Sequence, residues 1–464
     1  MSIFVNTQAG FRGISKIYSE FRNYFDFKKV SYCCIRQWVL RLGFGLLNQE
    51  VEKRNDWVYI IDFSIHLGKE RCLLILGVTM ESIFEHGYEL KHHQVRVLDI
   101  FVQEHFDGQS VSQRINFAKQ KTGTPYQIIS DNGNDVRKGI ELFNHENHEV
   151  IHTYDITHMI GICIKHSLEN NLQWLDLQND LTNLTQQVKQ SDVSFLRPIS
   201  LSKKARWLNI KNIIQWLSNI YAYEKQSDFH LISNGIKILN SQQLFEQNKA
   251  LCKNKYEQKR LEKDLKDTIF ENDKAIENLL EKYGIPQKDN VEIVDAGKAR
   301  FEEKFEVLKK HKQFFTELNE LNEMTENIKS AIKTNGLSIS ALKGIELEYE
   351  KISFDWIKQT FYEINNRLKV EYAKCGMEQK PILCCSDIVE SMFGKFKMKT
   401  NQVVGGIYET VLSIPLFCGN LTNDLTTEIL TKVKMTDVDN WFRQMTGVSN
   451  LAKRRIAFNK SHNC

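Results

Sequence analysis

Three acidic residues stand at positions where carboxylates could act on a phosphodiester. Asp62 lies inside the apolar stretch WVYIIDFSI, where an unpaired carboxylate would be costly to bury. Asp131 follows the apolar stretch PYQIIS, at the end of a predicted strand, which is the usual place for site residues in open α/β sheets. Glu390 lies far along the chain, in the predicted helix SDIVESMFGKFK. We expect these three acids to meet beside one sheet as catalytic residues.

Clustered carboxylates repel one another unless cations neutralise them. Hard oxygen ligands with open positions suit Mg²⁺, and Mn²⁺ could substitute for it. Two such ions would activate a water or a 3′-hydroxyl and stabilise the departing oxygen of a phosphodiester. We therefore predict that Asp62, Asp131 and Glu390 bind two Mg²⁺ ions. Each acid also has an ordinary alternative, namely a strand end for Asp62, a turn at DNG for Asp131 and a surface helix for Glu390.

Lysines follow Glu390 at helical spacing. Lys397 comes seven residues later, two turns along the same helix face, and Lys395 and Lys399 flank it. We predict that Lys395 and Lys397 contact a DNA backbone on its way to the acids. A solvated lysine-rich face would account for these charges, although not for their register with Glu390.

Two further clusters are candidates for assisting roles. The stretch YDITH places Asp155 and His158 at a predicted strand-to-helix junction, where they could position DNA or water, or could form a helix N-cap with a satisfied histidine. The stretch SKKARWLNI carries Arg206 and Trp207, which could hold a phosphate and stack on an unpaired base. The alternative for Trp207 is a place in the core of a helical domain.

The hydrophobic pattern predicts the elements that position the acids. From residue 57 the chain gives three strands, a helix, a strand, a helix and a strand, which predicts an α/β fold with one mixed sheet and flanking helices. The predicted strands are 57–65, 69–80, 93–102, 125–131 and 148–156, and the first helix between them is 110–123.

Two helices precede the first strand. The first lies in ISKIYSEFRNYF, and the second begins at Ser31 and ends at Gly43. This pair fits a helix-turn-helix that presents Arg36, Gln37 and Arg41 to the major groove of DNA. The alternative is a plain helical hairpin packed on the next domain.

The remaining chain is predicted to be helical up to the last acid. Between residues 157 and 382 no stretch reads as a strand. Two long charged helices, separated by the break YGIPQKDN, are predicted to form an antiparallel hairpin, which is a plausible interface between subunits. The predicted domains are a DNA-binding domain at 1–50, the first part of a catalytic core at 51–160, a helical insertion at 161–382, and the last part of the core with a basic tail at 383–464.

Composition is that of an ordinary globular protein, with 42% hydrophobic and 26% charged residues. Neither a membrane-spanning apolar run nor a secretory signal is recognisable, which predicts a cytoplasmic, nucleoid-associated protein. The net charge is only +4, but basic residues gather near both ends of the chain.

Together these features resemble the DDE transposases, whose catalytic core is RNase H-like. The resemblance rests on YIIDFS with Asp62, IISDNG with Asp131, DIVESMFGKFK with Glu390 and Lys397, and WVLRLG after a first helix. It covers residues 1–160 and 382–464, and several such families carry a helical insertion before the glutamate. The resemblance implies a transposase that binds terminal inverted repeats, cuts and joins DNA, and works as a homodimer or higher synaptic complex.

The resemblance is incomplete, and rival functions stay open. The tyrosine and arginine that precede the glutamate in some insertion-containing families are absent, since Ser386 and Leu383 occupy those places. The long interval after Asp131 leaves Asp387 as an alternative to Glu390. The rival functions are a catalytically idle DNA-binding protein and an RNase H-like nuclease that acts on branched DNA.

Overall fold

The computed structural model describes most of the chain, in two compact units. The described residues are 2–26, 28–67, 70–147, 150–199, 210–226, 229, 231–232, 236–238, 240–267, 273–285, 293–375, 380–400, 408–419, 421–446, 454–455 and 457–458. Unit 1 comprises Met1–Ile160, Glu326–Lys351 and Phe361–Cys464, and unit 2 comprises Gly161–Thr325 and Ile352–Thr360. Within the described ranges, no helix is both long enough and apolar enough to span a bilayer.

Unit 1 contains the mixed sheet that the sequence predicts. Its strands are β1 (Trp57–Leu67), β2 (Glu70–Thr79), β3 (Arg96–Gln103), β4 (Gln127–Ser130) and β5 (Ile151–Tyr154). They lie in the order β3-β2-β1-β4-β5, with β1, β2 and β3 antiparallel in turn and with β4 and β5 parallel to β1. The prediction of an α/β fold with one mixed sheet is confirmed.

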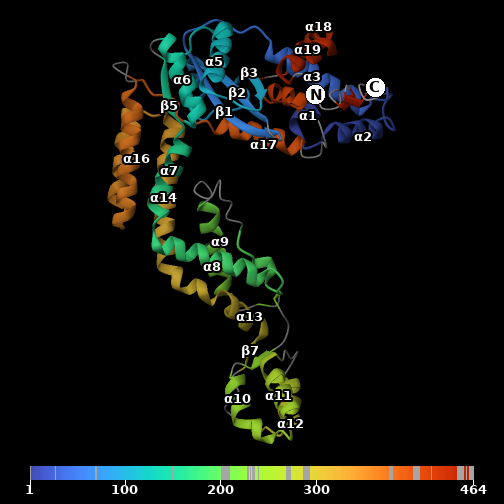
Figure 1. Cartoon of the computed structure of the whole chain (residues 1–464), viewed down its shortest axis with the longest axis vertical. Helices are drawn as coiled ribbons and strands as arrows, with labels where there is room; N and C mark the ends of the chain where they lie inside the picture. Colours follow the sequence, from blue (N-terminus) through green and yellow to red (C-terminus); the bar gives the residue numbers. More distant parts are fainter. Residues whose placement is uncertain are drawn as a thin grey trace. The chain divides into compact units, whose positions relative to one another are not determined.

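Both faces of this sheet are buried, which explains the nearly continuous apolar run of β1. Val58 and Ile60 belong to one hydrophobic cluster, whereas Tyr59 and Ile61 belong to another, because successive side chains of a strand point to opposite faces. The second cluster includes residues of α5 (Gly108–Thr122) and α6 (Asn134–Glu146). The first includes residues of α3 (Tyr32–Leu47), α17 (Asp387–Thr400) and the 3₁₀ helix η6 (Tyr408–Phe417). Figure 1 shows α3, α5, α6 and α17 beside the strands.

The N-terminal helices belong to this core rather than to a separate domain at 1–50. In α3, Ile35, Val39 and Leu40 are buried in the same cluster as strand residues of the sheet. The segment 22–31, which joins α2 (Phe11–Phe21) to α3, is also longer than the short turn of a helix-turn-helix. The amphipathic pattern of residues 31–47 therefore arises from packing on the sheet.

The second helix does not end at Gly43 as predicted. A Cβ atom at Gly43 would lie 1.6 Å from the carbonyl oxygen of Leu412, so glycine allows the close approach of η6 to the middle of α3. Glycine at this position is explained by packing, and α3 continues to Leu47.

The C-terminal part of unit 1 adds further helices to the core. They are α18 (Asn423–Lys432) and α19 (Met435–Thr446), which contribute Ile429 and Val438 to the first hydrophobic cluster. Helices α1 (Ser2–Asn6), α4 (Met80–His86) and α15 (Ile339–Glu346) also belong to unit 1. Residues 326–351 and 361–382, which the sequence assigned to the insertion, group with unit 1. Two backbone hydrogen bonds of 2.9 and 3.0 Å pair Leu337 with Ile382.

Unit 2 is mostly helical but contains a sheet that the sequence did not predict. Strands β6 (Ile236–Ile238) and β7 (Ile293–Asp295) pair antiparallel, and each is too short to give a periodic signal. Helix α7 (Ile156–Leu168) begins in unit 1 and continues into unit 2. The helices that begin in unit 2 are α8 (Leu172–Val188), α9 (Ile210–Glu224), α10 (Ser241–Asn248), α11 (Lys255–Asp267), α12 (Asp273–Lys282), α13 (Ala296–Phe305), α14 (Lys312–Asn335) and α16 (Asp355–Ala373).

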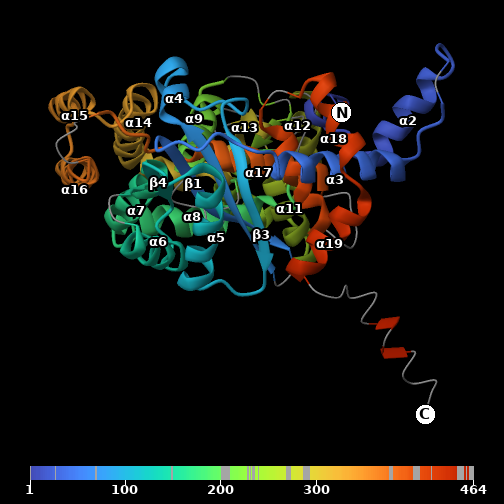
Figure 2. The same cartoon turned by 90° about the horizontal axis from the view of Figure 1, so that it is seen from above.

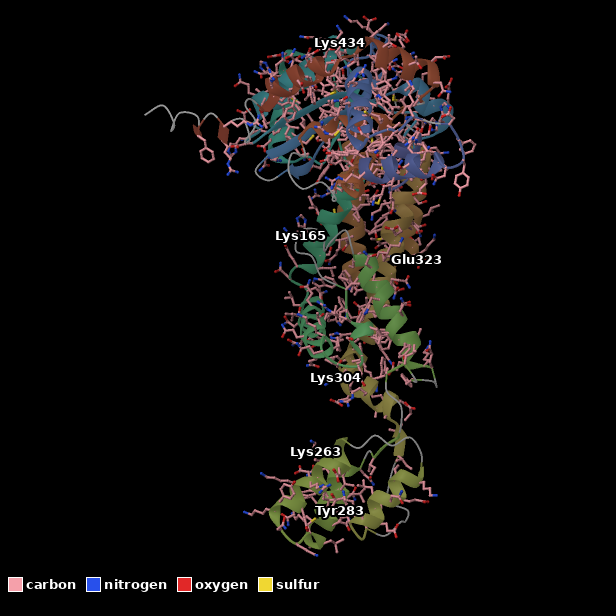
Figure 3. The ribbon with its side chains drawn as sticks, turned by 90° about the vertical axis from the view of Figure 1, so that its right-hand side faces the viewer. Lys165, Lys263, Tyr283, Lys304, Glu323 and Lys434 are labelled. Atoms are coloured by element: carbon pink, nitrogen blue, oxygen red, sulfur yellow. The ribbon has the colours of Figure 1, made fainter. Side chains whose placement is uncertain are left out.

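The first of the two predicted long helices corresponds to α11 and α12, and residues 268–272 lie outside the described residues. Their apolar residues, including Leu261, Leu265 and Leu280, form a small hydrophobic cluster together with residues of α10. Figure 3 labels Lys263 and Tyr283 in this part of unit 2.

Candidate active site

Asp62 and Asp131 come from neighbouring parallel strands at equivalent positions. Ile61 of β1 is in register with Ser130 of β4, and each of these residues directly precedes one of the two acids. Asp62 remains within β1, just before an irregularity between Phe63 and Ile65, while Asp131 is the first residue after β4. The parallel pairing therefore explains why acids far apart in sequence are neighbours.

A tight turn orients Asp131. The backbone N–H of Gly133 donates to Asp131 Oδ1 at 2.9 Å, and the N–H of Asn132 donates to Ser130 Oγ at 3.2 Å. Asn132 has a φ of 57°, in the left-handed region that asparagine tolerates better than most residues. The DNG sequence is thus a turn, as its ordinary interpretation holds, and this turn fixes the direction of the carboxylate.

Glu390 reaches the same place from α17, beside a histidine. His158 Nε2 lies 3.6 Å from Glu390 Oε1. The hydrogen bond with Glu390 raises the pKa of His158 to about 9 against the opposing effect of burial, and the charges of Asp155 and Asp131 add to the increase. A positively charged imidazole therefore accompanies the acids.

Burial and nearby negative charge both favour the protonated form of Asp62. Burial, followed by the charge of Asp131, raises the pKa of Asp62 to about 7; His158 opposes this shift, and Glu390 adds a smaller increase. The three predicted acids and His158 thus form one electrostatic cluster, which we call the carboxylate cluster.

Two other groups of potential metal ligands have ligand atoms closer together than those of the carboxylate cluster. Among the described residues, Asp155, Cys385 and Asp387 have ligand atoms within 4.8 Å of one another, as do Asp176, Asp180 and His311. Lysines already compensate the acids of both groups, since Lys333 pairs with Asp387, and Lys310 Nζ lies 2.8 Å from both Asp176 and Asp180. We therefore interpret these two groups as ion-pair networks.

Asp155 has the capping role that its sequence allowed, together with a second role. Its Oδ1 accepts a 2.9 Å hydrogen bond from the N–H of His158, which caps the start of α7. Its Oδ2 accepts hydrogen bonds from the N–H and hydroxyl of Ser386, at 2.6 and 2.7 Å. This buried carboxylate therefore joins the start of α7, which carries His158, to the start of α17, which carries Glu390.

Asp387 is engaged elsewhere. Its carboxylate pairs with Lys333 and accepts a 3.2 Å hydrogen bond from the hydroxyl of Thr157. Burial alone would raise the pKa of Asp387, but the hydrogen bond and charge of Lys333 keep it below its ordinary value. Glu390 rather than Asp387 is the acid of α17 that belongs to the carboxylate cluster.

The three lysines of α17 have different surroundings. Lys399 is buried: its ammonium donates to the carbonyl oxygens of Phe4 and, at 2.7 Å, Thr7, and burial followed by the charge of Lys395 lowers its pKa to about 8. Lys395 is half-buried, with Nζ 3.5 Å from His92 Nδ1. Lys397 is exposed, as is Glu390. Lys397 is therefore the lysine whose exposure best matches a contact with DNA.

Of the three predicted DNA-reading residues of α3, Arg41 is engaged within unit 1. The Arg41 guanidinium donates to the carbonyl oxygens of Val433, at 2.7 Å, and Leu430, so it caps the end of α18. Gln37 is exposed and Arg36 is half-buried. Arg206 and Trp207 lie outside the described residues.

Ser386 and Lys333 are partners of the site that the sequence did not predict. Ser386 is a polar residue at the start of the predicted helix, which is a signal for a helix cap. Its hydrogen bond to Asp155, however, depends on the tertiary fold. Nothing local to Lys333 indicates its pairing with Asp387.

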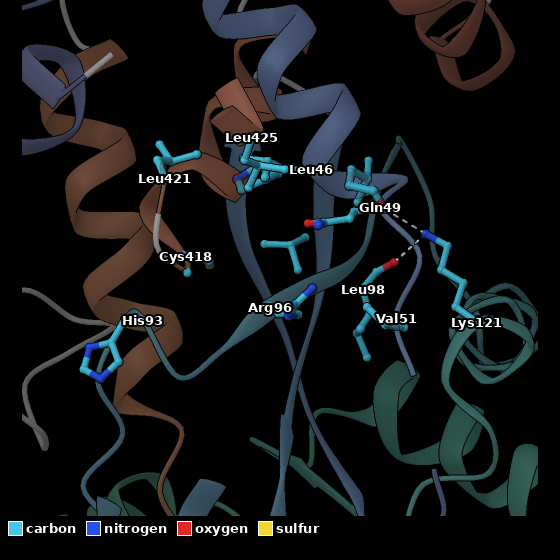
Figure 4. Close-up of a pocket in the computed structure, with 14 residues that line it drawn as sticks. Leu46, Gln49, Val51, His93, Arg96, Leu98, Lys121, Cys418, Leu421 and Leu425 are labelled. Atoms are coloured by element: carbon cyan, nitrogen blue, oxygen red, sulfur yellow. Dashed lines mark hydrogen bonds between the residues drawn. The ribbon is translucent and has the colours of Figure 1, made fainter. Parts of the chain in front are cut away.

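A pocket of about 270 Å³ lies in another part of unit 1. Figure 4 shows that its lining includes Leu46, Arg96 and Leu425, and that Lys121 donates to the carbonyl oxygens of Leu47 and Leu98, at 3.1 and 2.9 Å. No residue of the carboxylate cluster lines this pocket.

No protein-family model and no curated protein matches this chain. The carboxylate cluster and the sheet that carries it are therefore the features from which a function can be inferred.

Proposed function

We propose that unit 1 is the RNase H-like catalytic core of a DDE-type transposase, which cleaves DNA and transfers the cut strand. The observation that carries this proposal is the convergence of Asp62, Asp131 and Glu390 from β1, the end of β4 and α17. The sheet, in which two neighbouring pairs of strands are antiparallel and two are parallel, supports this proposal, because the resemblance to these transposases implies a mixed sheet of the RNase H-like kind.

The donor set fits divalent cations. All three acids offer carboxylate oxygens, the ligands that Mg²⁺ and Mn²⁺ prefer. Burial is the main cause of the raised pKa of Asp62, and the negative charges of Asp131 and Glu390 raise it further, so a cation bound here would favour the ionised form of Asp62. Mg²⁺ bound by these residues would activate the attacking oxygen and stabilise the leaving oxygen of the phosphodiester.

The surrounding residues position these acids. The turn at Gly133 orients Asp131, and the pairing of Asp155 with Ser386 fixes the two helices that bring His158 and Glu390 together. Lys397, exposed on the helix of Glu390, supplies a positive charge for the DNA backbone. A transposase also pairs two DNA ends, so we propose a dimer or higher complex with DNA.

The decisive experiment is a strand-cleavage assay with Mg²⁺ on DNA that carries the inverted repeats flanking the gene. We expect the unaltered protein to nick at the repeat boundary, while Asp131→Asn and Glu390→Gln still bind DNA but lose at least a hundredfold in cleavage rate, by analogy with the loss of a principal electrostatic contribution. Asp135→Asn is the matched control, because Asp135 lies in the next helix and pairs with Arg71 at 3.0 Å. Equal activity of Asp131→Asn and Asp135→Asn would refute the proposal.

The placement of α3 favours a second candidate, a nuclease that recognises DNA structure rather than sequence. The buried face of α3 and the engagement of Arg41 with α18 leave less of this helix for reading a major groove. In the same assay, this candidate predicts cleavage of branched DNA without preference for the repeats.

A further inference from the structure

The segment that joins α2 to α3 presents large aromatic side chains to solvent. Tyr24 is 80% exposed and Phe25 is 59% exposed, and Phe21 and Tyr32 on either side are also exposed. The rings of Phe21 and Phe25 meet edge to face, with centroids 6.4 Å apart. Exposed aromatic residues that gather in this way indicate a surface for another molecule. We call residues 21–32 the aromatic segment.

Positive charge surrounds the aromatic segment. Residues 11–36 carry six basic side chains against two acidic ones, which is an excess of four. The whole chain has a net charge of +4, so this short stretch accounts for all of it. The basic residues are Arg12, Lys16, Arg22, Lys28, Lys29 and Arg36.

One of these cations shows how charge and ring are combined. The Arg12 guanidinium lies over the ring of Tyr32, with Cζ 5.4 Å from the ring centroid. A flat aromatic surface next to cations complements a ligand that has both flat apolar faces and negative charge. Unpaired nucleotides have both, because the base stacks and the phosphate pairs with the cation.

We propose that the aromatic segment binds single-stranded or unpaired DNA by stacking bases on Tyr24 and Phe25. A second copy of the chain fits less well, since its own excess positive charge would oppose the contact. Figure 2 shows α2 extending from the end of α3, away from the strands of unit 1, where a strand of DNA could reach it. The choice of DNA over RNA rests on the proposed function, whereas the stacking surface does not.

This inference also changes the part played by the N-terminal helices. The sequence suggested that α3 reads duplex DNA, but the apolar face of α3 is committed to the core of unit 1. The connection before α3 takes over the contact with DNA in this proposal. Its ligand would be a strand whose bases are accessible, such as an opened DNA end.

The test measures binding of fluorescent oligonucleotides to the full chain by anisotropy, with EDTA present so that no cleavage contributes. The probes are a thymine oligonucleotide, an abasic strand of equal length and a duplex. We expect Tyr24→Ala and Phe25→Ala each to weaken binding of the thymine strand roughly tenfold. Binding of the abasic strand should change little, because no base is present to stack.

Two control variants remove exposed aromatic residues elsewhere. Tyr256 of α11 is 74% exposed, and Phe84 of α4 is also exposed, so Tyr256→Ala and Phe84→Ala should bind like the unaltered protein. Equal affinity of all variants for the thymine strand overturns the inference. So does a finding by light scattering that Tyr24→Ala only disrupts a dimer. Stacking without cleavage by the unaltered protein would instead refute the proposed function and leave this inference standing.

Discussion

At the scale of single residues, the arrangement of acids in the carboxylate cluster lowers the stability of the fold, and this loss can be measured at Asp62. Its pKa is raised from 3.8 to about 7, so between these values the folded chain keeps a proton that the unfolded chain has lost. This contribution to stability is present below pH 4 and disappears as the pH rises through 7. At pH 8, Asp62→Asn should therefore have a free energy of unfolding higher than that of the unaltered protein by on the order of 2 kcal/mol, as measured by urea denaturation. This difference should shrink toward pH 4.

The control for this prediction is Asp56, whose replacement should change the stability at pH 8 in the opposite direction. Hydrogen bonds with Arg54 lower the pKa of Asp56, so its charged form stabilises the fold above its ordinary pKa. Asp56→Asn should therefore be less stable than the unaltered protein at pH 8. Measurements would be made in EDTA, and a loss of stability in Asp62→Asn at pH 8 would show that its charge is not opposed by its neighbours.

Gly394 offers a second test at this scale. It lies within α17 between Glu390 and Lys397, and a Cβ atom there would meet nothing within 4 Å. Packing within the chain therefore does not require glycine, which costs a helix about 1 kcal/mol relative to alanine. We expect Gly394→Ala to stabilise the protein by about that amount but to slow DNA cleavage, because the added methyl group meets DNA passing from Lys397 to Glu390.

The matched control is Gly344→Ala in α15, where a Cβ atom also meets nothing within 4 Å. It should bring a similar gain in thermal stability with no change in cleavage. If both variants cleave DNA equally well, the path of the DNA over α17 is wrong.

At the scale of elements, the site depends on the junction between α7 and α17. Besides the two bonds from Ser386 to Asp155, the N–H of Ile156 donates to the carbonyl of Cys384 at 2.8 Å. Ser386→Ala removes one bond to a buried carboxylate, so we expect a loss of about 1–3 kcal/mol in the free energy of unfolding. Cleavage should also slow at a temperature where the variant is fully folded, because His158 and Glu390 are less firmly placed.

Ser391→Ala is the control on the same helix, since the Ser391 hydroxyl is exposed and lies 3.3 Å from His92 Nε2. Urea unfolding and cleavage rates of both variants would be compared. Unchanged cleavage in folded Ser386→Ala would mean that the junction supports stability alone.

Elements with a strong local pattern could be predicted, and those defined by distant partners could not. The apolar run around Ile60 and the turn after Asp131 identified β1 and the end of β4, which placed two acids of the cluster correctly. Gly43 looked like a helix end because its reason, the backbone of η6 around Leu412, lies far along the chain. Likewise, Arg41 looked available for DNA because its carbonyl partners belong to α18.

At the scale of the whole molecule, the chain has two compact units with separate buried cores. Leu40 in α3 of unit 1 and Leu177 in α8 of unit 2 are both fully buried. Leu40→Ala and Leu177→Ala should each cost about 2–5 kcal/mol, but in different units. Calorimetry should therefore show two unfolding transitions, of which each variant lowers only one. At a temperature where only unit 2 of Leu177→Ala is unfolded, this variant should retain the carboxylate cluster and nick DNA. A single transition that both variants lower would mean that the two units fold as one.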